Sequence, residues 1–232
     1  VTSIFVIGFM GMFLLARRFT NYYGGLIASA AFMLMPYRAV DLYVRGALSE
    51  LTAISFLPWV LFGFFYYLNK KNRLGFLILS FSTTLLALSH NILYFVSFPI
   101  LLLLILFWGN KKDKLKTGWA FLLGNLGAAY FLIPAFIEKK YISTGRLVES
   151  FYGGFEAHFL YFRQLWRGEW GYGGSVPGIN DFMSFIVGKE FLVLYALTAF
   201  AGLYLLIYKK KKFKNWKKFM FFSVLMGLAI FL

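Results

Sequence analysis

Long apolar stretches follow one another along most of this chain, and they restrict it to folds that are largely surrounded by lipid. Hydrophobic residues make up 60% of the sequence and charged residues only 14%, whereas soluble domains carry about 25% charged residues. Because a membrane-spanning helix needs about 20 apolar residues, we expect an all-α, polytopic membrane helix bundle with about eight spans. The expected spans are 1–16, 24–36, 48–68, 74–89, 92–108, 117–137, 189–208 and 219–232.

Both ends of the sequence are apolar, so we expect the first and last spans to be truncated. This pattern is typical of an internal fragment of a longer membrane protein, with a single transmembrane domain over 1–232. Cysteine is absent, which excludes a disulfide framework and thiolate metal sites.

Basic residues gather in four of the connections between the expected spans. These connections are Arg17 with Arg18, 69–73, 109–116 and 209–218. If the spans alternate, all four lie on one side and carry the whole formal net charge of +15. Cytoplasmic loops are enriched in Lys and Arg, so we expect a multi-pass plasma-membrane protein whose lysine-rich loops are cytoplasmic and whose 37–50 and 138–188 segments are extracytoplasmic. The lysine runs are then a topology signal and a contact with membrane lipid, and they do not indicate nucleic acid as a partner.

The segment PYRAVDLYVRGALSE, residues 36–50, places charge on the expected outer face. Helical spacing over 38–52 predicts one polar face made of Arg38, Asp41, Arg45, Ser49 and Thr52. Arginine suits phosphate binding, and a partly desolvated carboxylate such as Glu50 can act as a base. The alternative is an interfacial salt-bridge set that anchors a short helix, in which Glu50 pairs with Arg45.

His90 and Asn91 form the expected tight turn between two spans on the same outer face. They are candidate substrate contacts, although a lone histidine in a turn is more often a hydrogen-bonded structural residue. The only other histidine is His158, and no metal-ligand spacing is present. We therefore predict no metal site and no cofactor; a divalent metal has no support in the sequence.

Residues 138–188 form the only long loop and are rich in aromatic side chains. Helical spacing predicts an amphipathic interfacial helix, with an apolar face of Phe155, Phe159, Phe162 and Trp166 and a polar face of Glu156, Arg163 and Arg167. This helix either lies in the headgroup layer or covers an outer cavity. In the second case its aromatic rings stack on sugar or isoprenoid, and Arg163 and Arg167 are substrate-binding candidates.

The segments PYRAVDLYVRGALSE, FLPW and LLALSHN resemble a prokaryotic family of multi-spanning membrane proteins labelled "pyruvoyl-tetrahydropterin-synthase-related" (PTPS-related). The matching residues are Tyr37, Arg38, Asp41, Tyr43, Arg45, Gly46, Ala47, Glu50, Pro58, His90 and Asn91. That family is similar to the C-type (GT-C) integral membrane glycosyltransferases. Nothing in the chain supports pterin chemistry, because the soluble synthase uses a zinc site built from histidines and this chain has two histidines, far apart in the sequence.

The resemblance implies transfer of a sugar from a polyprenyl-phosphate carrier to an envelope acceptor on the outer face. It implies that Arg38 and Arg45 hold the lipid phosphate, that Asp41 and Glu50 are the catalytic or acceptor-orienting acids, and that the His90–Asn91 turn completes the cavity. Such enzymes typically place a key acid on the first outer loop, and this fragment is expected to begin after that loop.

Two other functions fit the sequence. A lipid or polysaccharide transporter or flippase predicts ionisable groups near the middle of the membrane, and the expected spans contain none there. A non-catalytic membrane scaffold for envelope assembly predicts that Arg38, Asp41, Arg45 and Glu50 pair fully with one another and face no cavity.

Overall fold

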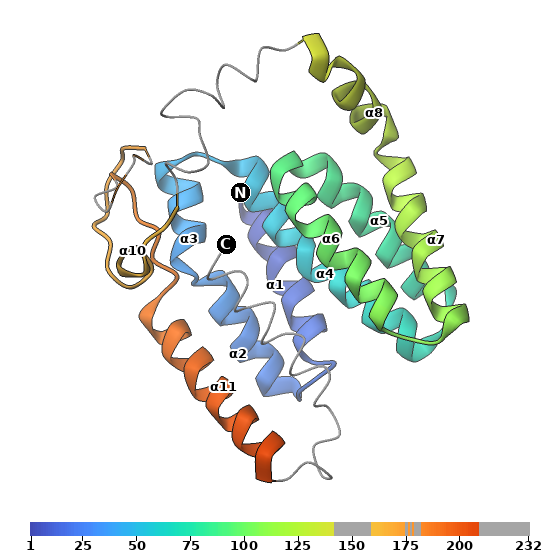
Figure 1. The fold of residues 1–232 in the computed structure, drawn as a ribbon, viewed down its shortest axis with the longest axis horizontal. Helices are drawn as coiled ribbons and strands as arrows, with labels where there is room; N and C mark the ends of the chain where they lie inside the picture. Colours follow the sequence, from blue (N-terminus) through green and yellow to red (C-terminus); the bar gives the residue numbers. More distant parts are fainter. Residues whose placement is uncertain (142–158, 175, 177, 179–181, 209–232) are drawn as a thin grey trace. The chain divides into compact units, whose positions relative to one another are not determined.

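The computed structural model describes residues 1–141, 159–174, 176, 178 and 182–208. Every regular element in this part is a helix, which confirms the all-α prediction (Figure 1). The chain divides into two compact units, Val1–Arg146 and Leu147–Leu232. Because each unit is compact by itself, we describe them separately.

The first unit contains most of the helices. They are α1 (Thr2–Ala16), α2 (Tyr22–Met33), α3 (Pro36–Ala39), the π-helical turn η1 (Val40–Val44), α4 (Leu48–Lys70), α5 (Arg73–Ser89), α6 (Asn91–Phe107), α7 (Lys111–Gly127), α8 (Ala129–Glu138) and the 3₁₀ turn η2 (Lys139–Tyr141). The described part of the second unit contains α10 (Phe162–Trp166) and α11 (Lys189–Tyr208).

Helix α4 is central to the first unit and packs against α1 on one side and α5 on the other (Figure 1). Small residues let the backbones approach closely, as is usual between helices in membranes. A Cβ atom on Gly63 would lie 2.6 Å from the backbone nitrogen of Leu79, so only glycine fits at this crossing of α4 and α5.

Two hydrogen bonds join neighbouring helices to this core. Trp59 Nε1 in α4 donates to the carbonyl oxygen of Ile7 in α1 at 2.8 Å. Thr84 Oγ1 in α5 donates to the carbonyl oxygen of Gly124 in α7 at 2.7 Å. Both contacts tie helices that are far apart in the sequence, and they hold α1, α4, α5 and α7 as one bundle.

The prediction of about eight spans is wrong for the described part of the chain. One helix there, α4, is long and apolar enough to cross a membrane. The number rises to three if each of two bent pairs is one span: α2 with Pro36–Val44, bent by 45°, and α7 with α8, bent by 70°. The expected span 219–232 lies outside the described residues.

Fewer helices than expected can cross a membrane because several of the apolar helices are short. The apolar helices α1, α5 and α6 contain only 15, 17 and 17 residues. At a rise of about 1.5 Å per residue, each is shorter than the hydrocarbon core of about 30 Å. Helix α11 has the same bounds as the expected span 189–208.

The prediction of a single helix over 38–52 is also wrong. Helix α3 passes into η1, where the backbone nitrogen of Arg45 donates a hydrogen bond to the carbonyl oxygen of Val40 at 2.9 Å. The chain then bends at Gly46, which has a φ of 61°. A π-helical turn and a bend change the helical phase, so the expected polar stripe is not formed. Instead, Arg38 and Asp41 lie inside the unit, with exposed fractions of 1% and 0%.

Candidate functional site

Four side chains meet at the bend between η1 and α4, and we call them the Arg45 cluster: Tyr37, Asp41, Arg45 and Glu50. Arg45 Nη1 lies 2.8 Å from Asp41 Oδ1 and 2.9 Å from Glu50 Oε2. Arg45 Nη1 also donates to the Tyr37 hydroxyl at 2.7 Å, and that hydroxyl donates to Glu50 Oε1 at 2.6 Å. The bend at Gly46 turns the chain so that Arg45 reaches both acids.

The two acids of the cluster differ in their access to solvent. The Asp41 side chain is fully buried, whereas the side chains of Glu50 and Arg45 are 12% and 32% exposed. A second molecule can therefore reach Glu50 and Arg45 but not Asp41. Partial burial acts to lower the pKa of Arg45, but Tyr37, Glu50 and Asp41 outweigh it and raise that pKa. Arg45 therefore stays charged and fixes the Glu50 carboxylate.

Arg38 lies apart from these ion pairs. Its Nη2 donates to Ser55 Oγ at 3.0 Å, and its guanidinium carbon lies 4.7 Å from the ring centre of Phe32 and 5.0 Å from that of Phe5. Its Nε and Nη1 atoms, like Asp41 Oδ2, are buried and have no hydrogen-bond partner among the described residues. The structure therefore places Arg38 in an aromatic pocket inside the helix bundle, where it is not free to bind a ligand at the surface.

His90 has a structural role in the turn between α5 and α6. Its Nδ1 accepts a hydrogen bond from the backbone nitrogen of Leu93 at 3.2 Å and so caps the N-terminus of α6. Asn91 is the exposed first residue of that helix. No hydrogen bond or ion pair in the described part of the chain joins either residue to the Arg45 cluster.

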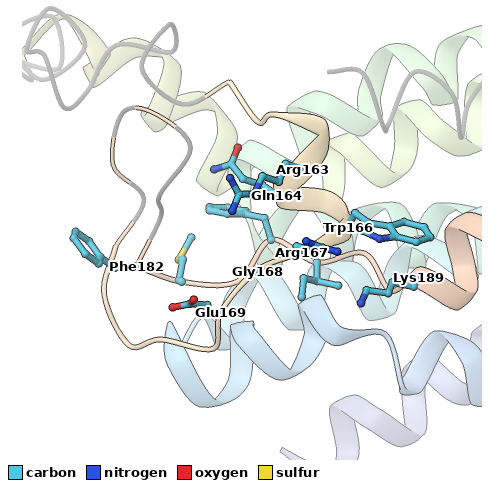
Figure 2. Close-up of a pocket in the computed structure, with 11 residues that line it drawn as sticks. Arg163, Gln164, Trp166, Arg167, Gly168, Glu169, Phe182 and Lys189 are labelled. Atoms are coloured by element: carbon cyan, nitrogen blue, oxygen red, sulfur yellow. The ribbon is translucent and has the colours of Figure 1, made fainter.

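The second unit contains a separate cavity of about 570 Å³, which Figure 2 shows in close-up. We call it the Arg163 pocket, and its lining is Arg163, Gln164, Trp166, Arg167, Gly168, Glu169, Phe182, Met183, Phe185, Ile186 and Lys189. In Figure 2, Trp166 and Lys189 lie at one end, and Phe182 and Glu169 lie at the other. No ion pair within the described residues neutralises Arg163 or Arg167, so the pocket keeps an excess of positive charge.

The sequence identified Arg163 and Arg167 but not all of their neighbours. Lys189, whose Nζ lies 6.0 Å from the ring centre of Trp166, was not predicted as a site residue. In the sequence, Lys189 stands out only as a basic residue at the start of the expected span 189–208. Helix α10 is also shorter than expected and covers only Phe162–Trp166; it buries Gln164 and Leu165 and leaves Phe162 68% exposed. Phe155, Glu156 and His158, which the sequence analysis named, lie outside the described residues.

In the described part of the chain, no group of three or more histidine, aspartate or glutamate residues could hold a metal ion. The acids of the Arg45 cluster have Arg45 as their shared cation. The Arg163 pocket has an excess of basic side chains, which suits an anion and opposes a bound cation.

No protein-family model and no solved structure matches the chain. Over 148 residues it is 28% identical to an uncharacterised protein from Lactococcus lactis subsp. cremoris (strain MG1363). The match covers 60% of this chain and 24% of that protein, so the chain spans only a part of the relative. This similarity assigns no family, and the PTPS-related resemblance stays a prediction.

Proposed function

We propose that the chain is part of a plasma-membrane glycosyltransferase of the C-type, which moves a sugar from a polyprenyl-phosphate carrier to an envelope acceptor on the outer face. In this proposal the lysine-rich loops are cytoplasmic, and 37–50 and 138–188 face outwards. The observation that carries the proposal is the Arg163 pocket, where Arg163, Arg167 and Lys189 line one cavity.

The lining of the Arg163 pocket suits a phosphorylated, partly apolar ligand. Guanidinium groups form paired hydrogen bonds with phosphate oxygens, and Lys189 adds a third positive charge. The indole ring of Trp166 supplies a flat face for a sugar or an isoprenoid unit. Among the described residues of the lining, Glu169 is the one carboxylate, and it can accept a hydrogen bond from a sugar hydroxyl.

Glu50 is the candidate catalytic base, because it is the acid of the Arg45 cluster that solvent reaches. In the proposed step the carboxylate takes the proton of the acceptor hydroxyl, whose oxygen then bonds to the anomeric carbon of the donor sugar. The bond between that carbon and the phosphate oxygen breaks, and the polyprenyl phosphate leaves with the electron pair. Asp41 acts through Arg45 as a positioning residue, since its own side chain is buried.

The main competing function is a non-catalytic scaffold. It is favoured by one observation: Arg45 already pairs with both acids, and Tyr37 completes the hydrogen bonding of Glu50. A structural anchor would have the same contacts. The two functions differ in whether the protein binds a polyprenyl phosphate and depends on Glu50.

The test uses the complete protein that contains this chain, reconstituted in liposomes. Binding of undecaprenyl phosphate is measured for the Arg163→Gln, Arg167→Gln double variant and for a control, Lys111→Gln with Lys112→Gln, which removes two exposed charges from α7. We expect about tenfold weaker binding in the first variant, because two charge-assisted contacts are lost, and wild-type binding in the control.

A second measurement follows sugar transfer from a set of undecaprenyl-phosphate hexoses. Glu50→Gln should lower the rate about 100-fold or more while undecaprenyl phosphate still binds, because only the base is removed. Equal binding by both double variants, together with full activity of Glu50→Gln, would exclude the glycosyltransferase and leave the scaffold.

A further inference from the structure

A second cavity, also of about 570 Å³, opens between α4, α5 and α7 in the first unit. We call it the Trp119 groove. Helix α4 ends at Lys70, and Tyr67 and Lys71 line the groove from that end. Helix α5 contributes its first two turns and α7 its middle part, so three helices form the walls.

Three basic side chains, Lys71, Arg73 and Lys116, lie at the polar end of this groove. Lys71 forms an ion pair with Asp113, which also interacts electrostatically with Lys116, and within the described residues no ion pair joins an acid to Arg73. The polar end therefore keeps a net positive charge, which is complementary to an anion.

Arg73 occupies the first position of α5, where the N-terminal end of a helix already has a partial positive charge. The first turn of α5 contains no acidic residue to balance it. By contrast, α7 has Asp113 in its first turn. A bound anion would supply the missing negative charge for both Arg73 and the end of α5.

The rest of the groove is apolar and open. Leu77, Trp119 and Leu123 line it and are 60%, 53% and 46% exposed. An apolar wall that continues directly from a cationic end matches a molecule with an anionic head and a hydrocarbon chain. A soluble anion would leave this wall uncovered.

We propose that the Trp119 groove binds an anionic phospholipid of the bilayer. The lipid phosphate lies against Arg73, Lys116 and Lys71, and an acyl chain covers Leu77, Trp119 and Leu123. Basic pockets between membrane helices bind anionic headgroups in this manner. The inference concerns a groove remote in sequence from the Arg163 pocket and does not depend on glycosyl transfer.

The test is native mass spectrometry of the complete protein that contains this chain, purified in detergent and titrated with phosphatidylglycerol or phosphatidylcholine. The groove variant is Arg73→Gln with Lys116→Gln. The matched control is Lys111→Gln with Lys112→Gln, which removes the same charge from the first turn of α7 but outside the groove. A thermal unfolding curve verifies that each variant is folded, and the single variants replace the double one if it is not.

We expect the groove variant to bind phosphatidylglycerol about 10- to 30-fold more weakly, since two cations near the phosphate are lost, while the control binds like the wild type. Binding of phosphatidylcholine should not change between the proteins. A third variant, Leu123→Gln, should also weaken phosphatidylglycerol binding, because it makes the acyl wall polar.

Two results would overturn the proposal. Equal weakening in the groove variant and in the control would mean that general surface charge attracts the lipid. Displacement of phosphatidylglycerol by an equal concentration of glycerol phosphate would mean that the groove takes a soluble phosphate. Undecaprenyl phosphate binding through Arg163 and Arg167 is measured separately, so either proposal can fail alone.

Discussion

The Arg45 guanidinium lies 2.9 Å from the Glu50 carboxylate, across the bend that separates η1 from α4. Because the same guanidinium also holds the fully buried Asp41, we expect Arg45→Gln to leave an uncompensated charge inside the unit. The expected loss in the free energy of unfolding is about 3 kcal/mol, at the low end for a broken buried pair because Arg45 is one-third exposed.

Denaturant titration of the protein in detergent micelles measures this loss, with the exposed Arg17→Gln as the control. A loss below about 1 kcal/mol would show that Arg45 acts as an ordinary surface cation and that the cluster does not anchor the bend.

Replacement of Arg38 should not lower the free energy of unfolding, in contrast to replacement of Arg45. It is 1% exposed, and two of its nitrogen atoms have no partner among the described residues. Methionine has a similar length and no charge to desolvate, so we expect Arg38→Met to keep or raise the free energy of unfolding. The same denaturant titration tests this, and a loss above about 2 kcal/mol would indicate that the contacts with Phe5, Phe32 and Ser55 outweigh the desolvation of the guanidinium.

Gly63 should not tolerate a side chain. Its Cβ would meet the Leu79 backbone at 2.6 Å, so Gly63→Ala requires α4 and α5 to move apart, at a cost of about 1–3 kcal/mol. The matched control is Gly118→Ala in α7, where nothing lies within 4 Å and alanine favours the helix. Thermal unfolding should therefore show a lower midpoint for the first variant and an equal or higher one for the second; equal shifts would contradict the close packing.

The sequence predicted the bounds of α1, α4, α5, α6 and α11 to within two residues at each end, but it did not predict the bends between helices. Apolar periodicity located α4 and α11, which begin at the expected residues 48 and 189. It did not locate the 70° bend between α7 and α8, because apolar residues continue on both sides of it within the expected span 117–137. A run of apolar residues therefore gives the total apolar length, whereas a spanning helix also requires an unbroken axis.

The same limit applies to the candidate site. Sequence spacing brought Arg45 close to Asp41 and Glu50, because contacts over four or five residues are set by local backbone geometry. It could not place Arg38, whose partners Phe5 and Ser55 come from α1 and α4. Lys189 joins Arg163 and Arg167 through the folding of the second unit, which no short motif encodes.

The ion pair between Lys71 and Asp113 connects the end of α4 to the start of α7, where Asp113 also completes the capping box with Asn110. Asp113→Asn keeps an oxygen that can accept the hydrogen bond from Asn110 but removes the charge. Because Lys71 is 44% exposed, the expected loss in the free energy of unfolding is about 1 kcal/mol or less. Lys71, which already lines the Trp119 groove, then has no carboxylate competing for its charge, so the variant should bind phosphatidylglycerol about fivefold more tightly. Lower stability with tighter lipid binding is the expected combination, measured by thermal unfolding and native mass spectrometry. Weaker or unchanged lipid binding in a folded Asp113→Asn protein would contradict a role for Lys71 in the groove.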